Sequence, residues 1–251
     1  MEFTAQNIVL PDGEQTNPGE LPLSEHARTQ AFMRVMRLAF GGRDPKTVRV
    51  ADLACLEGGF SVELARAGYT TLGIEGREEN IACCEYVRER VRLPNLEFVR
   101  DDVRNIESYG TFDALLCAGI LYHLDAPSHF LEALGRSARR VVILDSHYAT
   151  DPSPEGFPLG EWTSHEGRRG RWYAEFTEDE APEGFIPRWA SIGNRRSFWL
   201  DRRELVQAIR DAGFDLAFEQ LDYVDNSLTN EYVVQNARSM FVGVRTSDLP
   251  C

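Results

Sequence analysis

The chain has 251 residues, of which 43% are hydrophobic, so it can bury a sizeable core as one large α/β domain or as two small domains. This ordinary apolar fraction excludes a wholly disordered or fibrous chain. The formal net charge of -13 argues against a nucleic-acid backbone as the main partner, because such binding relies on clustered basic residues, and Arg168, Arg169 and Arg171 form only a small basic patch.

The first 23 residues are polar and contain several prolines and glycines, which predicts an irregular arm. They lack a basic region followed by an apolar one, so we expect no signal peptide. No apolar stretch reaches membrane-spanning length, and a cytoplasmic protein is therefore expected. The cysteines have neither metal-ligand spacing nor the pattern of a disulfide framework, and we expect reduced thiols at Cys55, Cys83, Cys84, Cys117 and Cys251.

The next part of the chain begins with a helix and then alternates between strands and helices. The segment SEHARTQAFMRVMRLAF carries apolar residues at helical spacing, and Ser24 is its expected N-cap. Five strands are expected, at VRVADLA, YTTLGIE, NLEFVRDD, FDALLCAG and RRVVILDS. Helices are expected over EGGFSVELARAG, starting near Glu57, and over REENIACCEYVRERVR and APSHFLEALGRS. Such alternation implies right-handed crossovers and a parallel sheet.

Residues 147–198 interrupt this alternation, because they have no clean periodicity. All four tryptophans fall between positions 162 and 199. A segment with so many aromatic residues is expected either to fold back as a lid over a binding site or to form a small satellite core. After it, DRRELVQAIRDAGF predicts a helix capped by Asp201 and ended by Gly213. The strands DLAFEQLDYV and ARSMFVGVRT then predict an antiparallel hairpin.

Acidic residues stand at the ends of the first three strands: Asp52, Glu75, and the pair Asp101 and Asp102. In an open α/β sheet, ligands bind outside the carboxyl ends of the strands. Glu75 is placed to accept hydrogen bonds from ribose hydroxyls, and an acid after the third strand can face an adenine amino group. Asp52 can hold the first loop or a ligand ammonium group. We expect Asp52, Glu75 and Asp102 on one rim, although acids at strand ends also cap helices or close turns.

The region from Val48 to Ser146 resembles the class I S-adenosylmethionine-dependent methyltransferases. The resemblance rests on VADLACLEGG, LGIEGREENI, NLEFVRDDVRNI and FDALLCAGILYHLDAPSHFLEAL, which occur in the order and spacing of that family. It implies an α/β, Rossmann-like, seven-stranded and mostly parallel sheet with an antiparallel last strand, and a lid-like insert after the fifth strand. It also implies the cofactor S-adenosyl-L-methionine, bound at Asp52, Ala54, Cys55, Gly58, Glu75, Gly76, Asp101, Asp102, Val103, Cys117, Gly119 and Tyr122.

The first loop departs from the family pattern Asp-x-Gly-x-Gly-x-Gly. Ala54 and Leu56 occupy the first two glycine positions, and Gly58 keeps the third. We expect Ala54 to have a negative φ, at which alanine is tolerated. Leu56 is expected to point its side chain away from the cofactor and into the fold. Gly58 and Gly59 then let the chain approach the methionine portion of the cofactor, so the loop is expected to be modified and not lost.

Methyl transfer by in-line displacement requires alignment, exclusion of water and, for some acceptors, a base. His123 and His147 are the candidate bases, because both lie at the carboxyl edge of the sheet, and a structural role is the alternative for each. The expected substrate-binding residues are His147, His165, Trp172, Tyr173, Trp189, Asn194 and Trp199. No metal is expected, because the spacing of the neighbouring histidines and acids is not diagnostic of a metal site.

The predicted organisation comprises an N-terminal arm and covering helix (1–44), a cofactor-binding half (45–146), a substrate-covering insert (147–198), and a C-terminal helix and hairpin that complete the same domain (199–251). We predict an enzyme that methylates an oxygen or nitrogen of a small molecule. A tRNA- or RNA-modifying methyltransferase is one alternative, because LYHL also resembles wobble-uridine enzymes. A non-catalytic binding protein is the other. No membrane partner is expected, and a homodimer stays open.

Overall fold

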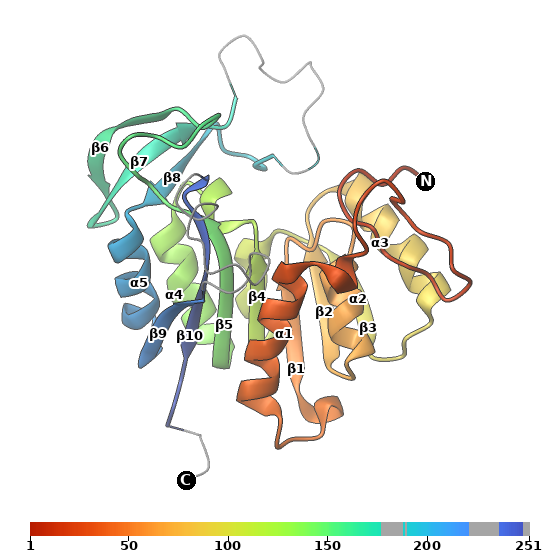
Figure 1. Cartoon of the computed structure of the whole chain (residues 1–251). Coiled ribbons are helices and arrows are strands. Elements are labelled where there is room, and N and C mark those ends of the chain that lie inside the picture. Colours follow the sequence, from red (N-terminus) through yellow and green to blue (C-terminus); the bar gives the residue numbers. More distant parts are fainter. Residues whose placement is uncertain (177–187, 189, 221–235, 248–251) are drawn as a thin grey trace.

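A seven-stranded sheet forms the centre of the fold (Figure 1) in the computed structural model, which describes residues 1–176, 188, 190–220 and 236–247. Its strands are β1 (Arg49–Leu53), β2 (Thr70–Glu75), β3 (Leu96–Arg100), β4 (Phe112–Ala118), β5 (Ala138–His147), β9 (Leu216–Gln220) and β10 (Arg238–Val244). Their order is β3-β2-β1-β4-β5-β10-β9. Only β10 runs antiparallel to its neighbours, between β5 and β9, so the fold predicted from the sequence is confirmed.

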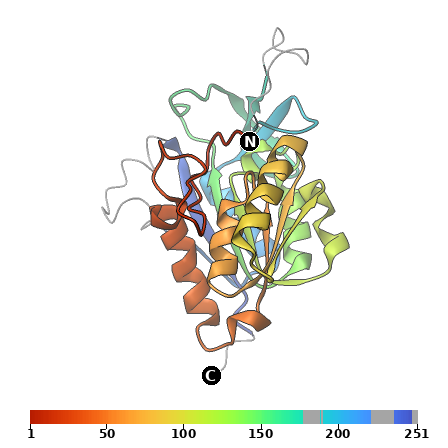
Figure 2. The same ribbon diagram turned by 90° about the vertical axis from the view of Figure 1, so that its right-hand side faces the viewer.

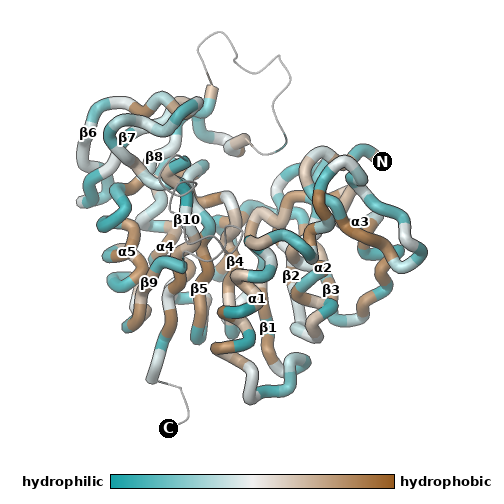
Figure 3. The backbone as a smooth tube through the Cα atoms, viewed as in Figure 1, coloured by the Kyte–Doolittle hydropathy of each residue, from teal (hydrophilic) through white to brown (hydrophobic). Residues whose placement is uncertain are grey.

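Helices cover both faces of this sheet (Figure 2). They are α1 (Ala27–Phe40), α2 (Gly59–Arg66) and α3 (Glu78–Val91) on one face, and α4 (Pro127–Ser137) and α5 (Arg202–Asp211) on the other. Successive side chains of β1 point to opposite faces of the sheet, so Val50 packs with α1 and α2 whereas Ala51 packs with α4 and α5. Hydrophobic residues therefore concentrate along the central strands, and hydrophilic ones in the segments beyond the strand ends (Figure 3).

A second, three-stranded antiparallel sheet lies beyond the carboxyl ends of the main strands (Figure 1). It contains β6 (Leu159–His165), β7 (Arg168–Ala174) and β8 (Arg196–Leu200). The sequence predicts no strands in residues 147–198, because they lack a clean periodicity. Glu166 and Gly167 both have positive φ, 51° and 75°, as in the two-residue turns that favour hairpins. Strand β6 is largely exposed, so it carries no apolar alternation from which to predict it.

The start of α1 also differs from the prediction. Ser24 does not cap this helix, because it lies in a short 3-10 helix, Leu23–Glu25. The N-cap position is His26, whose side chain makes no capping hydrogen bond. At the other end of the chain, Asp201 caps α5 by accepting a hydrogen bond from the backbone of Arg203, and Gly213 follows the helix with a φ of 96°, as predicted.

The N-terminal arm is attached to the fold through one buried acid. Helix α2 begins at Gly59 and not near Glu57, and the Glu57 side chain is buried. Its carboxylate accepts hydrogen bonds from Thr4 N (2.5 Å), Thr4 Oγ1 (3.0 Å), Ala5 N (3.2 Å) and Gln6 N (2.8 Å). The arm is thereby fixed beside the first loop of the sheet.

Among the described residues, no helix is both long and apolar enough to span a membrane. The cysteines in this part of the chain, Cys55, Cys83, Cys84 and Cys117, are free thiols in buried positions.

We predict that Glu57→Gln releases the arm. Glutamine keeps one oxygen acceptor but replaces the other with an NH2 donor, so the buried N–H groups that bond to the replaced oxygen would lose their acceptor. We expect a loss of about 2–3 kcal/mol in the free energy of unfolding and faster proteolysis within the first 23 residues. Urea denaturation and limited proteolysis measure these effects.

The matched control is Glu63→Gln, on α2. Its carboxylate pairs with Arg66 at the surface, and such pairs contribute little to stability. Equal stability of the Glu57 and Glu63 variants would contradict the role given to Glu57.

Candidate functional site

A cavity of about 580 Å³ lies at the carboxyl edge of the main sheet. The loops after β1, β2, β3 and β4 line one side of it, and the arm, the first turn of α1, Arg188 and residues 190–194 line the other. The predicted cofactor residues in its wall are Ala54, Glu75, Gly76, Asp101, Asp102, Val103, Gly119 and Tyr122. The wall also contains His123 and Asn194. The cavity has the size of sites that hold small molecules, roughly 300–1,000 Å³.

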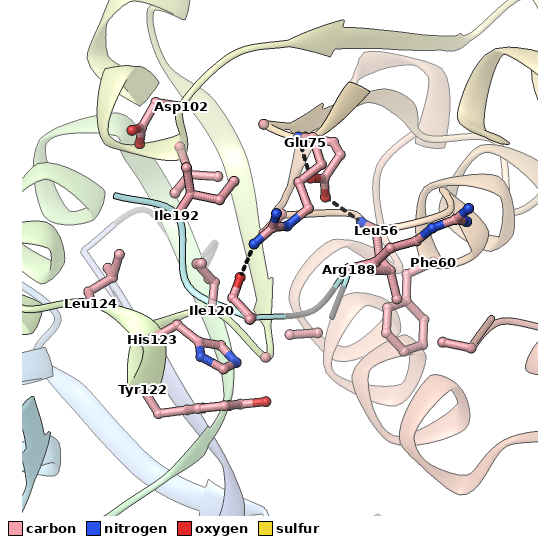
Figure 4. A pocket seen from close by; sticks show the side chains of 18 of the residues that line it. Leu56, Phe60, Glu75, Asp102, Ile120, Tyr122, His123, Leu124, Arg188 and Ile192 are labelled. Atoms are coloured by element: carbon pink, nitrogen blue, oxygen red, sulfur yellow. Dashed lines mark hydrogen bonds between the residues drawn. The ribbon is translucent and has the colours of Figure 1, made fainter. Parts of the chain in front are cut away.

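Glu75, the last residue of β2, is fixed in this wall. Its carboxylate accepts hydrogen bonds from the backbone N–H groups of Leu56 (2.9 Å) and Arg77 (2.8 Å) (Figure 4). Burial raises the pKa of the Glu75 carboxyl, whereas the two backbone donors lower it. Each carboxylate oxygen has more than one acceptor position, so Glu75 can also accept hydrogen bonds from ligand hydroxyls.

The loop after β1 holds two non-glycine residues in the left-handed region. Ala54 and Leu56 both have a φ of 56°, so the expected negative φ of Ala54 is wrong. Leu56 lines the cavity and belongs to none of the hydrophobic clusters formed by the described residues, so the expectation that its side chain turns into the fold is also wrong. The bond from Leu56 N to Glu75 helps to offset the conformational cost of about 1–2 kcal/mol.

Asp52 lies beneath the cavity and not in its wall. Its side chain is buried and accepts a hydrogen bond from Ser61 Oγ at 2.7 Å. Burial, reinforced by the charge of Glu75 and opposed by the hydrogen bonds from Ser61, raises the pKa of Asp52 to about 7. The predicted rim therefore contains Glu75 and Asp102 but not Asp52.

Three other predicted cofactor residues also lie outside the wall: Cys55, Gly58 and Cys117. The two cysteines are buried. Gly58 caps α2 with a φ of 85°, and a Cβ added there would lie 2.7 Å from the Phe98 ring. Packing and backbone conformation therefore require this glycine.

The acids after β3 have partners close by in the chain. Asp101 accepts a hydrogen bond from Tyr109 Oη at 2.7 Å, which lowers its pKa. Asp102 caps the 3-10 helix Val103–Tyr109 and pairs with Arg104 at 2.6 Å. Burial tends to raise the pKa of Asp102, but the hydrogen bonds from Arg104 lower it overall. Both acids are thus held as carboxylates in the cavity wall.

His123 lies in the cavity wall, in the short 3-10 helix Leu121–His123 that follows β4. Its Nδ1 lies 3.0 Å from both carboxylate oxygens of Glu175, which is nearly buried. Asn194 Nδ2 donates a hydrogen bond to the His123 carbonyl at 2.9 Å. When Nδ1 donates its hydrogen to Glu175, Nε2 is left as the proton-accepting atom.

His147, the last residue of β5, does not line this cavity. Its ring stacks on Trp199 with a centroid distance of 4.9 Å, and it meets Tyr122 edge-on at 4.7 Å. Nδ1 lies 2.8 Å from the Asn236 carbonyl. Burial, followed by the charge of Arg238, lowers the pKa of His147 to about 4. The ring is therefore a neutral part of an aromatic cluster, and the predicted roles as base and substrate ligand do not fit its position.

Two aromatic residues predicted to bind substrate belong to the same cluster. Trp199 is buried and donates a hydrogen bond through Nε1 to the Tyr122 carbonyl at 2.8 Å. Tyr173 packs against Trp199 at 5.3 Å. They form a satellite core with Leu159 and hold the loop after β4, which is the structural alternative that the sequence left open.

The remaining predicted substrate residues lie elsewhere. His165 and Trp172 line a second, more open hollow, and Asn194 lines both this hollow and the main cavity. Trp189 lies outside the described residues. In the part of the chain that is described, no three His, Cys, Asp or Glu side chains gather as a metal site.

Several cavity residues were missed from the sequence. Arg28 and Arg238 line the cavity and pair with the buried Asp145. Arg77 Nη2 donates hydrogen bonds to the carbonyls of Ala190 (2.8 Å) and Ser191 (3.1 Å), and so holds the insert over the cavity. One signal was present in the sequence: an acid within a buried strand, such as Asp145 in VVILDS, needs a partner for its charge.

Comparison with known proteins identifies relatives of this fold. Residues 50–142 match a family model described as a methyltransferase domain. The N-terminal domain of EvdMO1, solved with SAH bound, is 30% identical with a TM-score of 0.65, over 89% of this chain and 82% of that one. A second structure of that domain, in the presence of SAH and D-fucose, is 28% identical with a TM-score of 0.66, over 93% and 88%. The chain covers 41% of the longer EvdMO1 chain.

Two further similarities are more limited. Magnesium protoporphyrin IX methyltransferase (ChlM) from Synechocystis PCC 6803, solved with bound SAH, is 18% identical with a TM-score of 0.54, over 87% of this chain and 84% of that one, and it shares the fold alone. The YqeM protein of Bacillus subtilis (strain 168) is 31% identical over 101 residues, which are 39% of this chain. The chain thus spans about two fifths of the length of that curated relative, 39%.

We predict that Asp52→Asn changes how stability depends on pH. The folded-state pKa of Asp52 is raised to about 7 from 3.8, so the folded protein binds a proton that the unfolded chain has lost. The stability from this proton is fully present below the unfolded pKa and is lost as pH rises through the folded one. Between these two pKa values, the free energy of unfolding of the asparagine variant should therefore rise relative to that of the wild type by about 1.4 kcal/mol per pH unit.

Urea denaturation of both proteins at several values from about pH 5 to about pH 8 measures this difference. His147, whose lowered pKa acts in the opposite direction, is present in both proteins and cancels in the comparison. Parallel stability curves would show that Asp52 does not titrate in this range.

Proposed function

The chain belongs to the class I S-adenosylmethionine-dependent methyltransferase family, and from this premise we propose that it transfers the methyl group of S-adenosyl-L-methionine to an oxygen or nitrogen of a small-molecule acceptor. The observation that carries the proposal is one cavity lined by the carboxylate of Glu75 and by His123, whose ring pairs with Glu175. Glu75 is suited to bind the cofactor, and His123 is suited to act on the acceptor.

The residues of the first three strand ends fit the cofactor. Glu75 is held by two backbone donors and keeps acceptor positions for the ribose hydroxyls. Asp102 and Val103 lie in the cavity wall after β3, where the sequence predicts the adenine. Leu56 lines the cavity without filling it, since about 580 Å³ remains. This open volume disfavours a binding protein with a decayed cofactor loop.

The bound cofactor supplies an electrophilic methyl group on sulfur. The chain's own residues must orient the acceptor, exclude water and accept a proton. His123 is placed to accept the proton of an acceptor O–H or N–H at Nε2, while Glu175 fixes the ring through Nδ1. Residues 190–194 of the insert and Gln6 of the arm cover the cavity and limit the entry of water.

A small molecule fits this site better than RNA. The formal net charge of -13 is unfavourable for a phosphate backbone. The arginines Arg77, Arg104 and Arg188, all in the cavity wall, are bonded to groups of this chain. The relative crystallised in the presence of SAH and D-fucose is in keeping with a small hydroxylated acceptor.

We predict that Glu75→Ala weakens cofactor binding by at least about tenfold, because the ribose loses a charged acceptor. Isothermal titration calorimetry with S-adenosylhomocysteine measures the affinity. Glu78→Ala is the control, since this acid lies just beyond the same strand, is largely exposed and pairs with Arg100. An undiminished affinity of the Glu75 variant would refute the ribose assignment.

We predict that His123→Gln lowers kcat by about 10²-fold or more, as expected for loss of a general base, and leaves S-adenosylhomocysteine binding unchanged. Formation of S-adenosylhomocysteine is measured with a panel of alcohols, phenols and amines, and with total tRNA. His129→Gln is the control, because that histidine lies exposed on α4. Full turnover by the His123 variant would reject the base, and turnover with tRNA alone would reject the small-molecule acceptor.

A further inference from the structure

A buried carboxylate shared by two arginines lies beside the cavity. Asp145, on β5, is fully buried and accepts hydrogen bonds from Nε (3.0 Å) and Nη2 (2.8 Å) of Arg238, on β10. Nε of Arg28, in the first turn of α1, lies 2.9 Å from the same carboxylate. Both arginines line the cavity, with 27% of the Arg28 side chain and 16% of the Arg238 side chain exposed.

Asp145 does not use the full hydrogen-bonding capacity of Arg28. Arg238 already engages both oxygens of Asp145 in a two-bond pair. Arg28 reaches one of these oxygens through Nε, and within the described ranges its Nη1 and Nη2 groups bond to no acceptor. A guanidinium that is partly removed from water requires compensating acceptors. Arg28 therefore keeps donors for a ligand in the cavity.

The acids of the cavity wall do not serve as acceptors for the Nη groups of Arg28. They are Glu75, Asp101 and Asp102, and each already accepts hydrogen bonds from groups in the segments that follow β1, β2 or β3. Among the described residues, the one carboxylate within ion-pair distance of Arg28 is Asp145. The chemistry that suits Arg28 is therefore an anion supplied from outside the described part of the chain.

The two arginines lie at the same end of the cavity as the proposed base. A Cβ added at Gly119, which follows β4, would lie 3.4 Å from Tyr122 Oη and 3.6 Å from Arg238 Nη2. The Tyr122 ring in turn contacts the His123 ring, with a centroid distance of 4.4 Å. An acceptor within reach of His123 would therefore lie close to the Asp145 cluster.

We propose that Arg28, braced by Asp145 and Arg238, binds a carboxylate of the methyl acceptor, so that the substrate is an alcohol, phenol or amine that also carries a carboxylate group. This inference rests on the proposed function. The two Nη groups of one guanidinium match the two oxygens of a carboxylate. The amino-acid end of the cofactor carries the same group, and the experiment separates the two sources.

Binding is measured by calorimetry on wild type, Arg28→Gln and Arg28→Lys. One arm compares S-adenosylhomocysteine with 5′-methylthioadenosine, which lacks the amino-acid carboxylate. The other arm uses protein saturated with S-adenosylhomocysteine and compares 3-hydroxybenzoate with 3-hydroxybenzamide. We expect wild type to bind the benzoate about tenfold or more tightly than the amide. Arg28→Gln should abolish this preference, Arg28→Lys should retain part of it, and both variants should bind the cofactor product like wild type.

Arg37→Gln is the matched control, because Arg37 lies on the same helix and is exposed. A wild-type protein without preference for the benzoate, or an Arg28→Gln variant that keeps the preference, would overturn the proposal. If Arg28→Gln weakened binding of S-adenosylhomocysteine but not of 5′-methylthioadenosine, Arg28 would hold the cofactor's carboxylate and the acceptor assignment would fall. If wild type bound neither nucleoside, the proposed function itself would fail, which is a distinct result.

Discussion

The hydrogen bond between Glu75 and the backbone of Leu56 is the constraint on which the cavity depends. It ties the loop after β1 to the end of β2 and holds Leu56 in a left-handed conformation that a side chain disfavours. Because Glu75 is nearly buried, its charge is tolerable only while N–H donors face it, and Leu56 and Arg77 supply two. Loop geometry and ligand recognition are thus coupled through one carboxylate.

The same constraint explains why a loop that lacks two of the family's glycines keeps its shape. Glycine reaches positive φ without strain, whereas Ala54 and Leu56 reach it at a conformational cost. The bond to Glu75 and the partial packing of Ala54 against the core offset part of this cost. Sequence reasoning treated glycine as the determinant of the loop and missed that a neighbouring acid can impose the same backbone conformation.

The fold was predictable because its signals are local. Apolar runs, helical spacing and the stop at Gly213 each report on their own segment, and a parallel sheet then places the ends of β1, β2 and β3 at one edge. Side-chain direction was not predictable. His123 and His147 both lie at this edge, but stacking on Trp199, which comes from β8, turns His147 away from the cavity. The Asp145 cluster joins α1, β5 and β10, which are distant in the sequence.

The positions of the aromatic residues change where specificity is expected to lie. Aromatic side chains in and next to the insert suggested a substrate pocket, but Trp199 instead donates a hydrogen bond to the Tyr122 carbonyl, and Asn194 donates one to the carbonyl of His123. Together they make the loop after β4 a rigid part of the wall. Apolar packing therefore positions the proposed base, while charged groups that remain in the wall, such as Arg28, are available to select the ligand. Selection by charge would distinguish acceptors more sharply than a hydrophobic pocket, because an unpaired buried charge costs more than a lost apolar contact.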